Sequence, residues 1–288
     1  MSNEPTIMLA KNYDEENMAF PCYVSEKLDG VPVRIALGED GKPFAQSRQG
    51  KVVHSIQHIL DALAPVLTAH KKWAVVGELY ITGKAFEYIN GKVRKQENCP
   101  ELCLNLYDTV QGYARHDFQT RYGMMQDVAL AAKSPCVQAI PMLHCVNKAE
   151  LASNMAVIQQ QSQAQELEGF MVRIAQGEES LYYYGRSWGM MRIVPKPTLD
   201  LRVVDVLEAH NASRTALGRV GSFLVAYKGE IVKVGAGKGK KADLEVWWQN
   251  KNAIVGRIIQ VQYKPSSYAA LRQPTFQRVR YDKRRADA

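Results

Sequence analysis

Two short polar strings, one near each end of the chain, combine residue types that could do chemistry on a phosphate. They are Lys27-Leu28-Asp29-Gly30 and Arg280-Tyr281-Asp282-Lys283. Strand-like apolar runs flank the first string, so a glycine turn between two strands could hold the Lys27 amine against a phosphate. Taken alone, that string also fits a solvated lysine in a hairpin.

Further motifs lie between these two strings. In chain order they are Ser47-Arg48-Gln49-Gly50, Val76-Gly77-Glu78-Leu79, Leu106-Tyr107-Asp108, Leu167-Glu168-Gly169-Phe170-Met171-Val172-Arg173 and Val194-Pro195-Lys196. The ordered set resembles the nucleotidyltransferase motifs of ATP-dependent DNA ligases, and Phe276-x-Arg278-x-Arg280-x-Asp282-Lys283 resembles their C-terminal signature. Each motif is short, so the order of the whole set carries the resemblance, which covers nearly the whole chain.

The resemblance implies covalent chemistry at Lys27. An amine that attacks the α-phosphate of ATP forms a lysyl-AMP intermediate, which divides one hard condensation into easier steps. At a reference pKa near ~10.4, only about one lysine in a thousand is neutral near neutral pH, so the site must disfavour the ammonium form. By the resemblance, Lys196 and Arg192 supply the positive field at the α-phosphate. Asp29 would orient the loop or the ribose instead.

The resemblance also assigns the remaining site residues. Glu78 is expected to bind the ribose or order the site, Tyr107 to stack on the adenine and Arg48 to contact the phosphate end of the nicked strand. Glu168 is expected to hold Mg²⁺ or Mn²⁺, which would stabilise the charge on departing pyrophosphate. Without the motif order, each of these residues also fits a strand-edge charge or a core aromatic. ATP, as AMP donor, and Mg²⁺ (or Mn²⁺) are the implied cofactors.

Two positions depart from the family pattern. The family usually has an arginine two residues after the glycine of the first motif, where this chain has Pro32 and then Arg34. Positions 32 and 34 lie on the same face of a strand, so Arg34 could make the missing contact to DNA. In the fifth motif, the usual Lys-x-Lys is replaced by Val194-Pro195-Lys196.

The positive charge of the chain is concentrated towards its C-terminus. The net charge is +8; residues 198–288 carry 17 Lys and Arg against 8 Asp and Glu, whereas residues 1–197 carry 20 against 21. A small domain that basic usually faces a polyanion, because phosphate neutralisation releases counterions. The alternative is a basic surface that only keeps the protein soluble.

One glycine-rich loop within this basic region is a candidate phosphate-binding loop. Its lysines are Lys238, Lys240 and Lys241. Interspersed glycines would let the backbone approach a phosphate closely. A flexible, solvated loop explains the same composition equally well.

The apolar pattern predicts an α+β fold in two domains, since 288 residues with 46% hydrophobic content suffice for two cores. In residues 1–197, helical stretches are expected at 55–70, where Ser55 could cap the helix, and at 119–133 and 148–161. Strand-like runs are expected at 73–79, 102–107, 137–146 and 169–174. This pattern fits antiparallel sheets covered by helices better than a βαβ repeat. It agrees with the ATP-grasp-like nucleotidyltransferase (adenylation) domain that the resemblance implies.

Residues 198–288 are predicted to be almost entirely β. The expected strands and single helix lie at 201–207, 223–227, 231–234, 242–250 (helix), 254–263 and 275–281. Five strands with one helix are typical of an OB-fold barrel, a common binder of nucleic acid.

The sequence favours a cytoplasmic protein. It has no apolar stretch of about 18 residues, and its five cysteines are irregularly spaced. We expect a monomer without a membrane partner, in the host cytoplasm if phage-encoded, and associated with the nucleoid through DNA. The two-domain form is similar to the minimal ligases of bacteriophages and some bacteria.

The resemblance therefore implies an ATP-dependent DNA ligase that seals nicks between a 3′-hydroxyl and a 5′-phosphate in double-stranded DNA. An mRNA-capping guanylyltransferase has a similar lysine motif but would use GTP. An RNA ligase would prefer RNA strands. A non-enzymatic OB-fold nucleic-acid-binding protein would explain the basic domain but not the upstream motifs.

Overall fold

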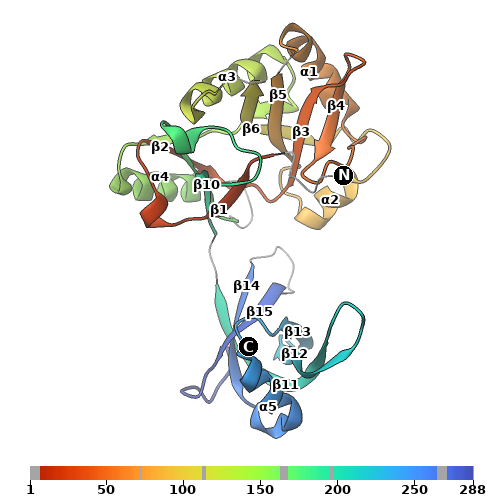
Figure 1. Cartoon of the computed structure of the whole chain (residues 1–288), viewed down its shortest axis with the longest axis vertical. Coiled ribbons are helices and arrows are strands. Elements are labelled where there is room, and N and C mark those ends of the chain that lie inside the picture. The colour runs from red at the N-terminus through yellow and green to blue at the C-terminus, as the bar shows by residue number, and fades with distance from the viewer. Residues whose placement is uncertain are drawn as a thin grey trace. The chain divides into compact units, whose positions relative to one another are not determined.

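The computed structural model describes most of the chain, in the ranges 7–71, 73–111, 115–162, 168–194, 197–264 and 271–287. The chain divides into two compact units, Met1–Val194 and Pro195–Ala288 (Figure 1). The boundary expected from the sequence, after residue 197, lies a few residues further along. Among the described helices, none has the length and apolar character needed to span a membrane.

Two five-stranded sheets form the first unit. The first sheet has the order β1 (Leu9–Asn12), β10 (Arg186–Ile193), β9 (Phe170–Ile174), β2 (Cys22–Glu26), β8 (Leu143–Cys145). The second has the order β4 (Pro43–Ser47), β3 (Val31–Leu37), β5 (Trp73–Tyr80), β6 (Cys103–Gln111), β7 (Val137–Ala139). Neighbouring strands are antiparallel except in the pairs β1–β10 and β6–β7, which are parallel. The expected mainly antiparallel sheets are therefore confirmed.

Helices cover these sheets. They are α1 (Gln57–Ala69) against β3 and β4, α2 (Phe86–Val93) against β3 and β5, α3 (Phe118–Ala131) against β6 and β7, and α4 (Lys148–Gln161) against β2 and β8. In α1, Ile59, Leu63 and Leu67 are fully buried at a spacing of four residues, which places them on one face. Short 3-10 helices at Glu15–Asn17 and Glu178–Ser180 complete the described helical segments of the unit.

Two local predictions for this unit are wrong. Ser55 does not cap α1: Ile56 occupies the N-cap position, and the buried Ser55 hydroxyl instead donates to the Val93 carbonyl at 3.0 Å. The single strand expected over 137–146 is two strands in different sheets, β7 and β8. Pro141 lies between them and has no N–H to give to a ladder, so the chain can change sheets there.

The strand alternation places polar residues on particular sheet faces. One face of the second sheet carries the main core, with Ile35 and Leu79 fully buried. Ala36 and Val76 lie on the opposite face in a smaller core that Tyr107 packs against. Because side chains alternate along a strand, Glu78 lies on the same face as Val76. In the first sheet, α4 covers one face of β2 and β8. Lys27 follows directly after β2, and the alternation along that strand assigns it to the opposite face.

The second unit is a closed barrel with the strand order β11-β12-β13-β15-β14. Its elements are β11 (Thr198–His210), β12 (Ala216–Tyr227), β13 (Glu230–Gly235), α5 (Lys241–Gln249), a 3-10 helix (Lys251–Ala253), β14 (Ile258–Lys264) and β15 (Arg272–Val279). The rings of Phe223, Trp247 and Phe276 pack together with centroid separations of 4.9 to 5.9 Å. The five strands and the α-helix between β13 and β14 agree with the prediction. The strand expected from Ile254 begins later because Gly256 turns the chain with φ +81°.

Candidate active site

Lys27 lies where β2 and the segment entering β9 meet. Its backbone N–H donates to the Gly169 carbonyl at 2.9 Å, and its Nζ lies 2.5 Å from Glu168 Oε2. Gly169 has φ +146°, and a Cβ there would come within 2.2 Å of the Ile193 carbonyl oxygen. Only glycine fits that position without backbone movement. Two residues 141 positions apart in the sequence are thus held together, with side chains 23% and 11% exposed.

Glu78 of β5 belongs to the same group of charges. Burial raises the pKa of Glu78 to about 8; Lys27 and a hydrogen bond from the Gly30 backbone lower it, and the negative charges of Glu168 and Asp29 raise it. A Cβ on Gly30 would meet the Leu79 carbonyl oxygen at 2.4 Å. The glycine therefore lets the loop after Lys27 pack directly on β5. Lys27, Asp29, Glu78 and Glu168, predicted from three motifs, form one electrostatic cluster.

Tyr107 occupies an irregularity in the ladder between β5 and β6. Val76 pairs with Asp108, whereas the next residue, Gly77, pairs with Leu106, so Tyr107 is the extra residue of a bulge. Bulges re-aim side chains and are common beside active sites. Burial and then the negative charge of Glu78 raise the pKa of Tyr107 well above its usual range. Tyr107 is therefore a neutral aromatic side chain close to Glu78.

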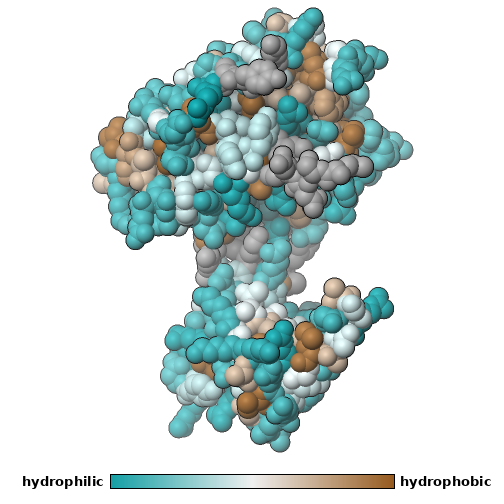
Figure 2. Space-filling model, in the orientation of Figure 1, coloured by the Kyte–Doolittle hydropathy of each residue, from teal (hydrophilic) through white to brown (hydrophobic). Residues whose placement is uncertain are grey.

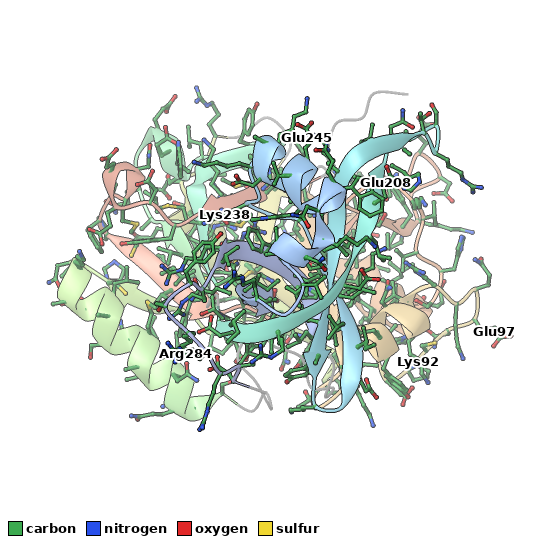
Figure 3. The ribbon with its side chains drawn as sticks, turned by 90° about the horizontal axis from the view of Figure 1, so that it is seen from below. Lys92, Glu97, Glu208, Lys238, Glu245 and Arg284 are labelled. Atoms are coloured by element: carbon green, nitrogen blue, oxygen red, sulfur yellow. The ribbon has the colours of Figure 1, made fainter. Side chains whose placement is uncertain are left out.

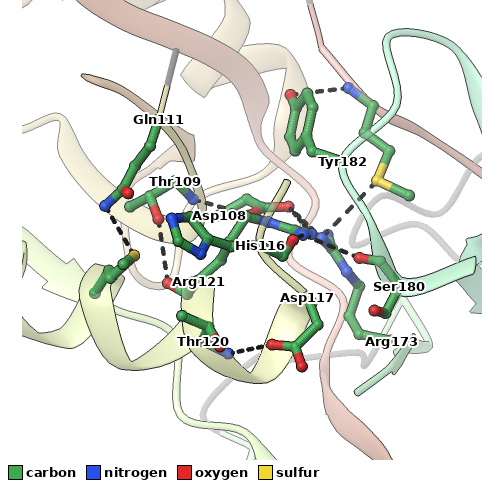
Figure 4. Close-up of polar contacts among 12 residues, drawn as sticks. Asp108, Thr109, Gln111, His116, Asp117, Thr120, Arg121, Arg173, Ser180 and Tyr182 are labelled. Atoms are coloured by element: carbon green, nitrogen blue, oxygen red, sulfur yellow. Dashed lines mark hydrogen bonds and ion pairs between the residues drawn. The ribbon is translucent and has the colours of Figure 1, made fainter. Parts of the chain in front are cut away.

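A buried ionic cluster follows directly after Tyr107 (Figure 4). Asp108 is fully buried and pairs with Arg121 of α3 and Arg173 of β9, each 2% exposed. The Arg121 Nε donates to Asp108 Oδ1 at 2.8 Å, and its Nη1 donates to the carbonyls of His116 and Ser180 at 2.7 and 2.9 Å. Burial acts to raise the pKa of Asp108, but the two guanidinium groups hold it below its usual value. The cluster joins strands of both sheets to α3.

Sequence reasoning did not find this cluster. Asp108 and Arg173 are the last residues of two motifs, but nothing in either motif indicates that the two pair. Arg121 lies outside every motif. The available signal was its spacing from the apolar residues of α3, since Phe118, Met125 and Val128 lie on the same face of the helix as Arg121. A charged side chain on a buried face needs a buried partner.

The other predicted residues of the first unit are dispersed. Arg192 of β10 donates from Nε to Asn12 Oδ1 at 3.0 Å, and Arg48 lies in an exposed turn after β4. Pro32 pairs with Glu78 across β3 and β5, and Arg34 pairs with Val76, so Arg34 shares the face of Glu78. The Arg34 Nε is buried and has no hydrogen-bond partner among the described residues. Lys196 lies outside the described residues.

In the second unit, the predicted catalytic cations contact carboxylates of their own barrel. The Arg280 Nη1 and the Lys283 Nζ each lie 2.6 Å from Asp200 Oδ2. The Arg280 Nε and Nη2 also donate to Asp282 at 2.9 and 2.7 Å, and Lys283 lies 3.2 Å from Asp287. Asp200 lies outside every sequence motif.

The lysine-rich loop joins β13 to α5. Lys238, Lys240 and Lys241 are all exposed, and Lys238 is labelled near α5 in Figure 3. The backbone N–H of Lys238 donates to the Phe276 carbonyl at 3.0 Å, and Gly237 has φ +47°. The loop is therefore held to β15 by its backbone while its ammonium groups extend into solvent.

The raised pKa of Glu78 predicts a pH-dependent effect of Glu78→Gln. In the folded protein Glu78 keeps its proton up to about pH 8, whereas its ordinary pKa is 4.5. Between these values the folded state binds more protons than the unfolded state, so the stability of the wild-type protein falls as pH rises. Glutamine cannot ionise, so the variant should gain stability relative to wild type from about pH 5 to about pH 9, by a few kcal/mol, since one pKa unit is about 1.4 kcal/mol.

Urea unfolding of both proteins at the two pH values measures this difference. Glu87→Gln is the matched control, because Glu87 is exposed on α2, and it should show no such trend. A stability difference between Glu78→Gln and wild type that is the same at both pH values would contradict a protonated Glu78.

Comparison with known proteins identifies the fold. No protein-family model and no curated protein matches the sequence. Among solved structures, Pmar-Lig_PreS3 is 19% identical with a TM-score of 0.77, over 95% of this chain and 67% of that one. A structure of the Lig E DNA ligases is 20% identical with a TM-score of 0.71, over 95% and 98%. The ATP-dependent DNA ligase of bacteriophage T7, in complex with ATP, is 17% identical with a TM-score of 0.56, over 95% and 98%. The chain therefore has the fold of the ATP-dependent DNA ligases.

Proposed function

We propose that this protein is an ATP-dependent DNA ligase that seals nicks in duplex DNA through a lysyl-AMP intermediate on Lys27. The observation that carries the proposal is the cluster of Lys27, Glu168 and Glu78 in a chain with the ligase fold. Lys27 follows β2 and Glu168 precedes β9 in the first sheet, and Glu78 lies in β5 of the second. Residues 1–197 act as the adenylation domain and residues 198–288 as an OB-fold domain.

In the first step, the Lys27 nitrogen attacks the α-phosphorus of ATP. A bond forms between Nζ and phosphorus while the bond from the α-phosphorus to the bridging oxygen breaks, and pyrophosphate leaves with that electron pair. Nζ must lose a proton, and Glu168, whose Oε2 lies 2.5 Å from Nζ, is a carboxylate within reach to receive it. Tyr107 stacks on the adenine, Glu78 binds the ribose, and Asp29 orients the loop that carries Lys27.

The residues present fit a divalent cation held jointly with the nucleotide. Among the described residues, no group of three or more His, Cys, Asp or Glu could hold a metal alone. Mg²⁺ is commonly bound by one or two carboxylates together with substrate phosphates, and Glu168 offers such a carboxylate. The ion, Mg²⁺ or Mn²⁺, would supply charge stabilisation for the departing pyrophosphate.

The next two steps take place on DNA. The 5′-phosphate at the nick attacks the lysyl-AMP phosphorus, which releases the Lys27 amine and leaves AMP on the DNA end. The 3′-hydroxyl then attacks the 5′-phosphate and displaces AMP. Arg48 and Arg34 bind the 5′-phosphate, and Arg192 and Lys196 bind the phosphate of AMP; the Arg34 Nε, which has no partner among the described residues, supports this assignment.

The barrel binds the duplex through its positive charge. Residues 198–288 carry 17 Lys and Arg against 8 Asp and Glu, and hydrophilic residues dominate the barrel face seen in Figure 2. Lys238, Lys240 and Lys241 bind backbone phosphates, since their side chains are exposed on a loop anchored by its backbone. Arg280 and Lys283 orient the β- and γ-phosphates of ATP during the first step.

A nick-sealing assay tests the proposal. The purified protein, incubated with Mg²⁺, should seal a 5′-phosphorylated nick in DNA with ATP and not with GTP. It should seal the matched nick in an RNA duplex at least tenfold more slowly. Labelling by GTP without sealing would instead support a guanylyltransferase, and faster sealing of the RNA nick would support an RNA ligase. Binding to DNA without either activity would support a non-enzymatic role.

A further inference from the structure

Asp200 is the centre of the contacts made by the C-terminal motif. Its side chain, at the start of β11, is 5% exposed. A single oxygen, Oδ2, accepts from both Arg280 Nη1 and Lys283 Nζ at 2.6 Å each. The other oxygen, Oδ1, is buried without a hydrogen-bond partner among the described residues. One buried carboxylate thus fixes the spacing between two cations that lie three residues apart.

The backbone of Asp200 anchors the same segment. The Asp200 N–H donates to Asp287 Oδ2 at 2.7 Å, and the Asp287 N–H donates to the Asp200 carbonyl at 2.8 Å. Arg202, two residues further along β11, donates to the Arg284 carbonyl at 3.0 Å. The segment that carries both cations is therefore attached to the first strand of the barrel, and not only to β15, from which it emerges.

The three carboxylates around the two cations differ in how easily they can be displaced. Asp282 is 65% exposed and Asp287 is 39% exposed, whereas Asp200 is 5% exposed. An incoming polyphosphate would compete with all three for Arg280 and Lys283. The exposed carboxylates can rotate into water at little cost. A buried carboxylate that lost its two cations would be left without either a partner charge or water around it, which is unfavourable.

Donor groups remain for a phosphate while Asp200 stays in place. A guanidinium has five N–H donors and an ammonium has three. Among the described residues, Arg280 uses three donors and Lys283 uses two, and the contacts to Asp282 and Asp287 are the exposed ones. Replacing the exposed carboxylates by phosphate oxygens would leave each cation bound to Asp200 on one side and to the nucleotide on the other.

We infer that Asp200 is a positioning residue for the adenylation step: it holds Arg280 and Lys283 at the spacing that the β- and γ-phosphates of ATP require. This inference rests on the proposed function and names a residue that acts only through the two cations. Asp200 itself does not touch the nucleotide. Its effect should be confined to the first step, because sealing a pre-adenylated nick involves no pyrophosphate.

The test is Asp200→Asn in single-turnover assays of the two steps, one with saturating ATP and one with a pre-adenylated DNA nick. We expect the rate of lysyl-AMP formation to fall at least tenfold and the sealing of the pre-adenylated nick to change less than twofold. Asp205→Asn is the matched control, since Asp205 lies on the same strand and pairs with a lysine, Lys251, at 3.1 Å. It should change neither rate.

A double-mutant cycle distinguishes positioning from a general structural role. If Asp200 acts through Lys283, Asp200→Asn should cost much less in a Lys283→Gln background than in the wild-type protein. Asp287→Asn should lower adenylation less than twofold, because Asp200 still holds Lys283 and the amide oxygen of asparagine can still accept from the Asp200 N–H. Equal losses in both steps for Asp200→Asn, additive losses in the cycle, or a tenfold loss for Asp287→Asn would each overturn the inference.

The wild-type protein separates this inference from the proposed function. If wild type forms lysyl-AMP and Asp200→Asn forms it at the same rate, only the positioning role is wrong. If wild type forms no lysyl-AMP from ATP, the proposed function fails, and the role of Asp200 fails with it.

Discussion

Lys27→Ala should abolish transfer of AMP from ATP to the protein and, with it, nick sealing. The side chain supplies the nitrogen that lies 2.5 Å from Glu168 Oε2, and the loss of a covalent nucleophile commonly removes several orders of magnitude in rate. We expect no labelled protein after incubation with ATP carrying a label on the α-phosphate. The sealing rate should be at least 1,000-fold below wild type, a rise of about 4 kcal/mol in the barrier.

The same variant should retain the last step. A pre-adenylated nick has already passed lysine chemistry, so Lys27→Ala should seal it far better than it seals an ordinary nick with ATP. Lys42→Ala, in the exposed turn between β3 and β4, is the control and should label and seal as wild type does. Persistent AMP labelling of Lys27→Ala would assign the nucleophile to another residue.

Asp108→Asn should destabilise the first unit more than any surface substitution. Asp108 lies between Arg121 and Arg173, and all three side chains are at most 2% exposed. The amide has no charge to balance the two buried guanidinium groups, and removing one partner of a buried ionic pair typically costs about 3–5 kcal/mol. We expect a loss of that size in the free energy of unfolding of the first unit, measured by urea denaturation.

Asp127→Asn is the matched control, because Asp127 lies exposed on α3, the helix that supplies Arg121. It should change the free energy of unfolding by less than about 0.5 kcal/mol. If Asp108→Asn were as stable as this control, the buried cluster would not be what ties the two sheets and α3 together. A loss of nick sealing in a stably folded Asp108→Asn would instead point to a role in placing Tyr107.

The fold was predictable from the sequence where the pattern was local. The apolar spacing in α1 and the short β-rich runs of the barrel follow from periodicity alone. The helix α2 was missed because it has only eight residues and buries only two of them, Ile89 and Val93. One pair of apolar residues four positions apart is too little to show a helical periodicity. The strand β1 was missed because it is four residues long and none of the four is fully buried. Only its pairing with β10 makes it a strand.

The site was predictable only in part, because its contacts depend on the order of strands in space. The motif resemblance selected Lys27 and Glu168, but their contact arises because β2 and β9 are neighbours in the first sheet. The pairing of Asp108 with Arg173 likewise needs two different sheets to face each other. Asp200 lies in no motif, and its role becomes visible only when the barrel brings the start of β11 against the end of the chain.

Mapping the site of AMP attachment tests the central claim most directly. The purified protein, incubated with ATP and Mg²⁺ and then digested, should yield one peptide heavier by the mass of one adenylyl group. Fragmentation should place that group on Lys27, and pyrophosphate should reverse the modification. An adenylyl group on any other residue, or an unmodified protein that still seals nicks with ATP, would contradict the account.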